Sequence, residues 1–209
     1  LGDVYKRQYI GIGTNSYYAN TCKMRLDSSG NMYVASRDTL QKFDPYFSRT
    51  WQTLFNYNSN QACHEIFLDS SSNVYMCRPN SLLTLSNIAK FNSSGVLQWQ
   101  RDIPGSPIVT GVADSSGNIY VINYDSNSSP RYLYLYKYNS SGVLQWQKSL
   151  DSGAAGNAVL LNSNLFVDSS TNIYVACTTT ITATIFAATS TFYVTRLVKY
   201  NSSGVLQWQ

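Results

Sequence analysis

One stretch of eleven residues recurs along this chain: Lys137-Tyr138-Asn139-Ser140-Ser141-Gly142-Val143-Leu144-Gln145-Trp146-Gln147. The same letters return at Lys199–Gln209 and, with Phe91 in place of Tyr, at Lys90–Gln100. A more divergent fourth copy occupies Lys42–Gln52. Self-similarity of this kind is typical of repeat proteins, in which each copy is one structural unit.

A second motif, Asp-Ser-Ser-x-Asn-x-Tyr, alternates with the first and is followed by apolar residues. Its four copies begin at Asp27, Asp69, Asp114 and Asp168. An aspartate can accept hydrogen bonds from the backbone of its own turn, and a glycine supplies the positive φ that such turns need. The Asn-Ser-Ser-Gly part of the first motif has the same character, with its glycines at Gly95, Gly142 and Gly204. Both motifs predict hairpin turns, so each module contains two hairpins and four strands.

The modules cover residues 21–55, 63–101, 108–150 and 158–209, and their turn aspartates are 42, 45 and 54 residues apart. Four strands in about 40 to 50 residues are typical of one blade of a β-propeller. We therefore expect an all-β fold of about four four-stranded antiparallel blades. The expected strands, lettered A to D within each module, are 23–27, 31–36, 39–43 and 50–55; 64–69, 73–77, 87–91 and 96–101; 109–114, 118–123, 132–138 and 143–150; 161–168, 172–177, 192–200 and 205–209.

The strands also predict how the sheets pack. In strand B of the third module, Tyr120 and Ile122 face one way while Ile119 and Val121 face the other, so both faces need cover. Strand D is more amphipathic, which is typical of a partly solvated outer edge. We expect the tryptophans to pack between blades, at Trp51, Trp99, Trp146 and Trp208.

The ends of the chain and its charge limit other interpretations. Read back into codons, Leu1–Gln8 match the end of a transposase sequencing adapter, so we treat residues 1–8 as an artefact and expect the chain to be cut at both ends. Without Asp3, Lys6 and Arg7 the chain has 13 basic and 10 acidic residues, which are spread without runs of like charge. This pattern does not predict binding to nucleic acid or to anionic membranes. The cysteines lie on expected strands and are interpreted as buried thiols, with a disulfide left open: Cys22, Cys63, Cys77 and Cys177.

An uncharged run, Asn172–Thr195, is long enough to be considered as a membrane span. Its threonines and β-branched residues favour a long hairpin instead. The exposed Thr and Ile residues of such a hairpin would favour pairing with another chain.

The alternation of Asp-x-x-Gly-Asn-x-Tyr-Val with Lys-aromatic-x-x-x-Gly-x-x-x-Trp resembles the seven-bladed β-propeller repeat family and, more loosely, the NHL and PQQ-type propeller repeats. The resemblance extends from about Thr21 to the last residue. It implies a ring that commonly has six to eight blades, so the four modules would form an open arc of a larger ring. A closed four-bladed ring is the alternative. Propellers support binding, scaffolding and catalysis, so the resemblance predicts architecture rather than function.

Candidate chemical sites have simpler structural interpretations. One aspartate per turn is too few for calcium, and the sequons at Asn92, Asn139 and Asn201 are also turn sequence. His64 and Glu65 are neighbours on a strand and point to opposite faces. We therefore expect no catalytic residues, no metal and no cofactor. We interpret the recurring lysines as snorkelling or pairing beside the turns: Lys42, Lys90, Lys137 and Lys199. The enzymatic alternative is a PQQ-dependent quinoprotein, whose acidic ligands and adjacent cysteine pair are not found in this sequence.

The connections between strands predict where a partner binds. The A–B and C–D turns are short and nearly identical, whereas the B–C and D–A connections vary and lie on the opposite rim. Function usually lies on the variable loops of a rigid scaffold. We therefore expect a protein or carbohydrate surface to contact Arg37, Asp38, Arg78, Asn80, Tyr124, Asp125, Arg131 and Asp151. The sequence as a whole suggests a non-enzymatic binding or structural module that is extracellular, on a cell surface or in a virion. We also expect an open arc to self-associate through its uncovered blade faces.

Overall fold

The computed structural model describes residues 22–36, 39–55, 63–80, 82–125, 132–150, 163–185 and 188–209, with the backbone alone for residues 179–185 and 188–194. Within these residues all regular elements are strands, and they form four antiparallel sheets of four strands each. The all-β prediction of four four-stranded blades is therefore confirmed.

The first blade consists of β1 (Lys23–Leu26), β2 (Met32–Ala35), β3 (Thr39–Phe43) and β4 (Arg49–Leu54). The second consists of β5 (Glu65–Leu68), β6 (Val74–Pro79), β7 (Leu85–Phe91) and β8 (Leu97–Pro104). The third consists of β9 (Ile108–Ala113), β10 (Ile119–Asp125), β11 (Tyr132–Tyr138) and β12 (Leu144–Ser149). The fourth consists of β13 (Ser163–Val167), β14 (Ile173–Ile185), β15 (Ala188–Tyr200) and β16 (Leu206–Trp208).

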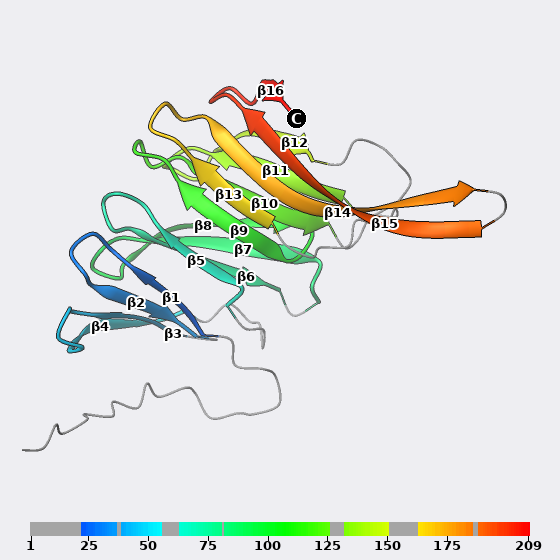
Figure 1. Ribbon diagram of the computed structural model, residues 1–209. Coiled ribbons are helices and arrows are strands. Elements are labelled where there is room, and N and C mark those ends of the chain that lie inside the picture. The colour runs from blue at the N-terminus through cyan, green and yellow to red at the C-terminus, as the bar shows by residue number, and fades with distance from the viewer. Residues whose placement is uncertain are drawn as a thin grey trace, which may run out of the picture.

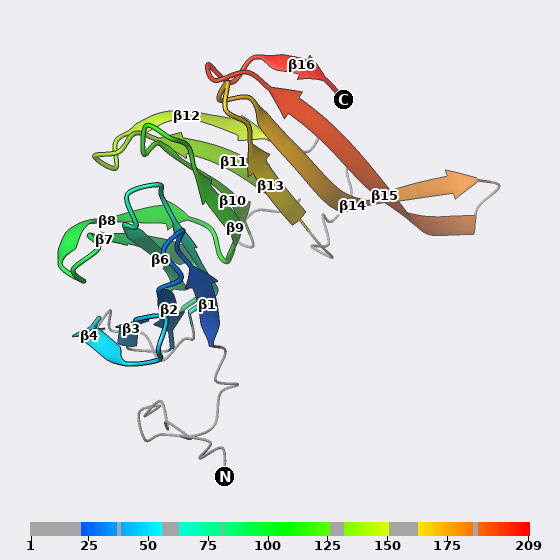
Figure 2. The same cartoon turned by 60° about the vertical axis from the view of Figure 1, so that its left-hand side comes forward.

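Strand order within each blade follows the chain, as in an antiparallel meander. The first strand of each blade contacts the first strand of the next, so β1, β5, β9 and β13 form the inner row. Figures 1 and 2 show the blades fanning out from this row, with the first and last blades at opposite ends of an open arc. The fourth strand of each blade is the outer edge, as its amphipathic sequence predicts.

Three apolar cores fill the spaces between successive blades. In the first of these, Tyr33 and Leu40 of blade one pack with Ile66 and Met76 of blade two. Corresponding side chains fill the other two spaces. Full burial of one large apolar side chain contributes about 1.5–3 kcal/mol. Each middle blade is therefore stabilised through both of its faces.

The fourth blade differs from the prediction in the length of its middle strands. Strands B and C were expected at 172–177 and 192–200, but β14 and β15 are each 13 residues long. Their pairing continues from Ile173 opposite Tyr200 to Ile185 opposite Ala188. The long hairpin is thus confirmed, and the described residues contain no helix long and apolar enough to cross a membrane.

Each Asp-Ser-Ser turn is held by one recurring hydrogen-bond network. In the third blade, Oδ1 of Asp114 accepts from the backbone amides of Ser116 and Asn118, at 3.0 and 2.9 Å. Its Oδ2 accepts from the Asn118 carboxamide at 2.8 Å and from the Tyr120 hydroxyl at 3.1 Å. The same four donors recur around Asp27, Asp69 and Asp168. One network therefore explains why Asp, Asn and Tyr recur at fixed spacing.

We predict that Asp114→Ala lowers the free energy of unfolding by about 3 kcal/mol, because it removes an ionised acceptor from four donors in a buried turn. Asp44→Ala is the matched control, since Asp44 accepts only two exposed amide bonds, from Tyr46 and Ser48. That change should cost about 1 kcal/mol. Urea denaturation measures both, and equal losses would contradict a special role for the Asp-Asn-Tyr network.

Candidate binding surfaces

The two rims of the arc have different characters. The A–B and C–D turns gather on one rim, which we call the turn rim, where Ser72 of blade two donates to Asp27 of blade one. The B–C and D–A connections lie on the opposite rim, which we call the connection rim. In Figure 1 the β14–β15 hairpin projects on the side away from the A–B turns.

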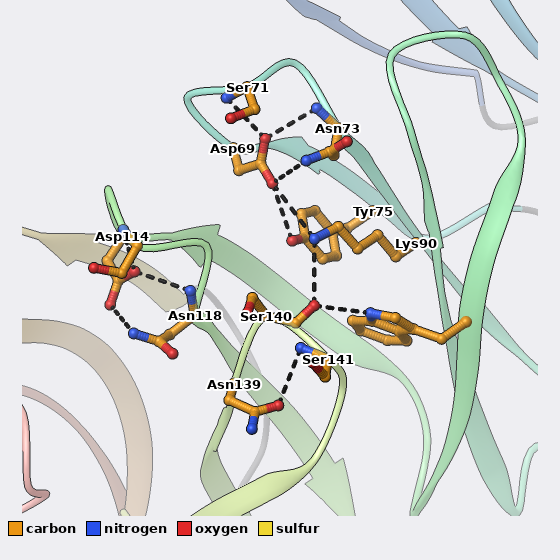
Figure 3. Close-up of polar contacts among 12 residues, drawn as sticks. Asp69, Ser71, Asn73, Tyr75, Lys90, Asp114, Asn118, Asn139, Ser140 and Ser141 are labelled. Atoms are coloured by element: carbon orange, nitrogen blue, oxygen red, sulfur yellow. Dashed lines mark hydrogen bonds and ion pairs between the residues drawn. The ribbon is translucent and has the colours of Figure 1, made fainter.

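Lysine and tryptophan side chains link the blades along the turn rim. The Lys90 ammonium lies over the Tyr75 ring, 5.2 Å from its centroid and 3.8 Å from Oδ2 of Asp69. It donates to the Ser140 carbonyl of the next blade at 3.3 Å, and Nε1 of Trp99 donates to the same oxygen at 3.0 Å. Figure 3 shows Lys90 reaching from Asp69 and Tyr75 to Ser140. This pairing beside the turn agrees with the structural interpretation of the lysines.

The same link recurs one blade further along. Lys137 and Trp146 donate to the Ser202 carbonyl at 2.8 and 3.3 Å. In the first blade Trp51 donates to the Ser93 carbonyl at 3.0 Å. The three tryptophans therefore lie between blades, as the sequence predicts. The fourth, Trp208, is 48% exposed.

Each linking tryptophan also packs against a glycine of the next turn. A Cβ added to Gly142, whose φ is +74°, would lie 2.8 Å from Cδ2 of Trp99. Gly95 and Gly204 have the same relation to Trp51 and Trp146. Glycine is required at these positions for two reasons. An L side chain is strained at positive φ, and the indole leaves no room for a Cβ.

The connection rim carries only part of the predicted partner surface. Arg37, Asp38, Arg131 and Asp151 lie outside the described residues. Tyr124 and Asp125 end β10 and are partly exposed. Oδ1 of Asn80 accepts from the amides of Thr84 and Leu85 at 2.8 and 3.2 Å, so this side chain shapes the β6–β7 connection.

The prediction that Arg78 lies on the partner surface is wrong, because only 1% of this residue is exposed. Its guanidinium donates to the Phe55 carbonyl at 2.8 Å and lies over the Phe55 ring, 5.9 Å from the centroid. Asn87 is its cross-strand neighbour and donates to Asp102 at 2.8 Å. Arg78 therefore ties blade two to blade one beneath the rim and does not face a partner.

The most prominent feature of this rim is the β14–β15 hairpin. On one side, β13 pairs with β14 only as far as Cys177. On the other, β16 pairs with β15 only at Lys199 and Tyr200. Among the described residues, the outer part of the hairpin is therefore a ribbon of two strands with two open backbone edges.

Glu65 links the inner strands of the first two blades. Its carboxylate accepts from the Arg25 guanidinium and from the amide of Ile66. Burial raises the pKa of Glu65 although Arg25 opposes the shift. Burial also lowers the pKa of His64. The Glu65 carboxylate therefore bonds to groups of this molecule, the Arg25 side chain and the Ile66 backbone.

Among the described residues, the remaining titratable groups form no cluster suited to metal chemistry. In the part of the chain that the structure describes, no group of three or more His, Cys, Asp or Glu residues could hold a metal ion. Cys63, Cys77 and Cys177 are buried, as expected, and burial raises the pKa of the Cys63 thiol to about 12. Cys22 is exposed, contrary to the prediction, and lies beside β1, whose own side chains are largely exposed.

No family model and no curated protein matches this chain, but its fold is similar to solved structures. The Dos1 propeller has a TM-score of 0.58 at 8% identity, covering 90% of this chain and 47% of that chain. A Bacteroides caccae protein of unknown function has a TM-score of 0.53 at 11% identity, with coverages of 92% and 82%. Drosophila Plexin A, solved in complex with Semaphorin 1b, has a TM-score of 0.51 at 9% identity, with coverages of 90% and 40%.

At these identities the similarity shows the fold alone, and that fold is the β-propeller. The open arc predicted from four modules is consistent with the arrangement of the four sheets, in which the first and last blades lie at opposite ends (Figure 2). The chain spans less than half of the Dos1 and plexin chains that it resembles. Its relation to the seven-bladed, NHL or PQQ-type repeats remains a prediction.

We predict that Gly142→Ala is more destabilising than Gly117→Ala, although both glycines have a φ near +75°. The strain of an L residue at positive φ is common to both changes and costs about 1–2 kcal/mol. A Cβ at Gly117 would have Ser140 Cβ as its nearest neighbour at 3.4 Å, whereas a Cβ at Gly142 would meet the Trp99 ring. Overpacking should add about 1–3 kcal/mol at position 142 in urea denaturation. Equal losses would mean that backbone conformation alone selects the glycine.

Proposed function

We propose that this chain is a non-enzymatic, protein-binding β-propeller module of a secreted, cell-surface or virion protein. Its partner contacts the connection rim, chiefly through the β14–β15 hairpin. The observation that supports the proposal most directly is the pair of open edges on this hairpin.

Two features suit the hairpin to binding an extended protein segment. An open strand edge presents a row of amides and carbonyls that can pair with another strand, and natural proteins usually protect such edges with charges or proline. Asn172–Thr195 contains neither. Peptides that add to a sheet edge gain affinity from the backbone and specificity from alternate side chains.

The turn rim is less suited to binding a partner, because many of its polar side chains are already engaged within the molecule. Its turn aspartates accept hydrogen bonds within their blades, and Lys90, Trp99, Lys137 and Trp146 donate to the next blade. Tyr124 and Asp125 lie at the end of β10 on the connection rim and are partly exposed, so they can contribute polar contacts to a partner. One structure of similar fold, Plexin A, was solved in complex with a protein. The near-identity of the modules suggests internal duplication, which suits a repetitive adhesive or structural surface.

The test uses a variant in which Asn-Gly replaces residues 179–194. The turn then joins Thr178 to Thr195, which face each other across β14 and β15. Peptides are selected from a phage-displayed random library against the full chain, and their affinities are measured by fluorescence anisotropy. We expect the truncation to weaken binding by at least about tenfold, or 1.4 kcal/mol, without lowering the melting temperature.

The matched control is Ser94→Ala, on the turn rim, which should leave peptide affinity unchanged. Tyr124→Ala, on the connection rim, should reduce it. Peptides that bind the truncated variant as well as the full chain, or that depend on Ser94, would show that the binding surface has been assigned wrongly.

A further inference from the structure

The outer face of blade four repeats a surface that the next blade covers elsewhere. Leu197 occupies the position of Leu40, Ile88 and Leu135, each two residues before the recurring lysine. Those three side chains are fully buried, whereas Leu197 is 57% exposed. This face, which we call the end face, therefore has the composition of an interior surface.

Other positions on the end face follow the same pattern. Phe166 corresponds to Phe67, two residues before the turn aspartate. Phe67 is 4% exposed and Phe166 is 63% exposed. A cavity of about 620 Å³ opens on this face, lined by Thr195, Arg196, Leu197, Trp208 and Gln209. The cavity lies beside Trp208, which is the tryptophan that would contact the C–D turn of a following blade.

The end face also presents the two hydrogen-bond donors that link the inner blades. Lys199 lies over the Tyr174 ring at 5.1 Å, as Lys90 lies over Tyr75. Trp208 packs beside the same ring, with centroids 6.4 Å apart. In blades two and three these donors meet at one backbone carbonyl, and a glycine follows two residues later.

We propose that the end face is a docking site for a further β-blade whose C–D turn has the form Asn-x-x-Gly. The second residue of that turn supplies the carbonyl that accepts from Trp208 and Lys199. The glycine, at positive φ, leaves room for the Trp208 ring. The site repeats the construction of two interfaces within this molecule, between blades two and three and between blades three and four, and the Trp51–Gly95 contact of the first interface shares its tryptophan and glycine. It is separate from the β14–β15 hairpin edges.

The first blade of a second copy of this chain does not meet these requirements. The corresponding turn there is Asp44-Pro45-Tyr46-Phe47, so Phe47 stands where the glycine is needed. Phe47 has a φ of +62°, and its side chain is 64% exposed. Its ring would compete with Trp208 for the same space. The docking site therefore selects a repeat that keeps the glycine.

The test extends the full chain with a second copy of residues 148–209, joined after Gln209. Because Lys199–Gln209 is identical to Lys137–Gln147, the junction reproduces a sequence that the chain already contains. Leu197→Cys, in a Cys22→Ser background, places a reporter thiol on the original end face. Alkylation of this thiol should slow by about tenfold or more in the extended chain, because labelling then requires local opening.

The matched control is Gly204→Phe in the appended copy alone, which imitates Phe47 and should restore fast alkylation at position 197. Equal alkylation rates in the extended and unextended chains would overturn the proposal. So would a control that stays protected, because the glycine would then have no selective role. Slow alkylation of the unextended chain, together with a dimer in light scattering, would identify a second copy as the occupant and would also overturn it. None of these outcomes alters the peptide-binding test of the hairpin.

Discussion

The arc depends on one contact, the seating of a tryptophan ring on the glycine of the next turn. The indole needs a surface without a Cβ, and its N–H needs the carbonyl two residues before that glycine. Both needs are met by a turn in which the glycine also has to adopt positive φ. Since Trp and Gly belong to the same eleven-residue motif, the copies of blades two and three each provide a tryptophan to the next blade and a glycine to the preceding one. A substitution in one copy therefore affects two blades, which explains why the copies remain so similar in this part of the sequence.

The Asp-Asn-Tyr network supports this contact from within each blade. The aspartate fixes the tyrosine hydroxyl, and the tyrosine ring then lies beneath the lysine that reaches the next turn. Burial and the neighbouring Asp69 carboxylate raise the pKa of Tyr75, so it remains a neutral donor. Polar groups on the turn rim are consequently engaged in structure. Among the described residues of the connection rim, no such network recurs from blade to blade.

Features that depend on local chemistry could be predicted from the sequence. The turns, the strand order and three of the four predicted inter-blade tryptophans follow from Asp, Gly, Asn and Trp at fixed spacing, whereas Trp208 lies on an exposed face. Arg78 could not be placed this way, because its burial depends on the Phe55 carbonyl of another blade. The strands of the fourth hairpin were predicted too short, because the repeat frame came from modules with shorter connections. Cys22 was expected to be buried with the other cysteines, but it lies beside β1, whose side chains are largely exposed at the end of the arc.

The two open surfaces of the arc impose different kinds of selectivity. A hairpin edge offers backbone groups and tolerates many sequences, whereas the end face requires a glycine and a carbonyl at defined positions of one turn. Closely similar repeats can favour head-to-tail association of copies, because a heterologous interface that does not close forms filaments. In the proposed docking mode Phe47 opposes this contact, since it stands where the glycine for a tryptophan from another copy would be needed. We infer that the divergence of the first motif gives the arc a direction: blades add to the end face of blade four, and the first blade does not accept the tryptophan of another copy.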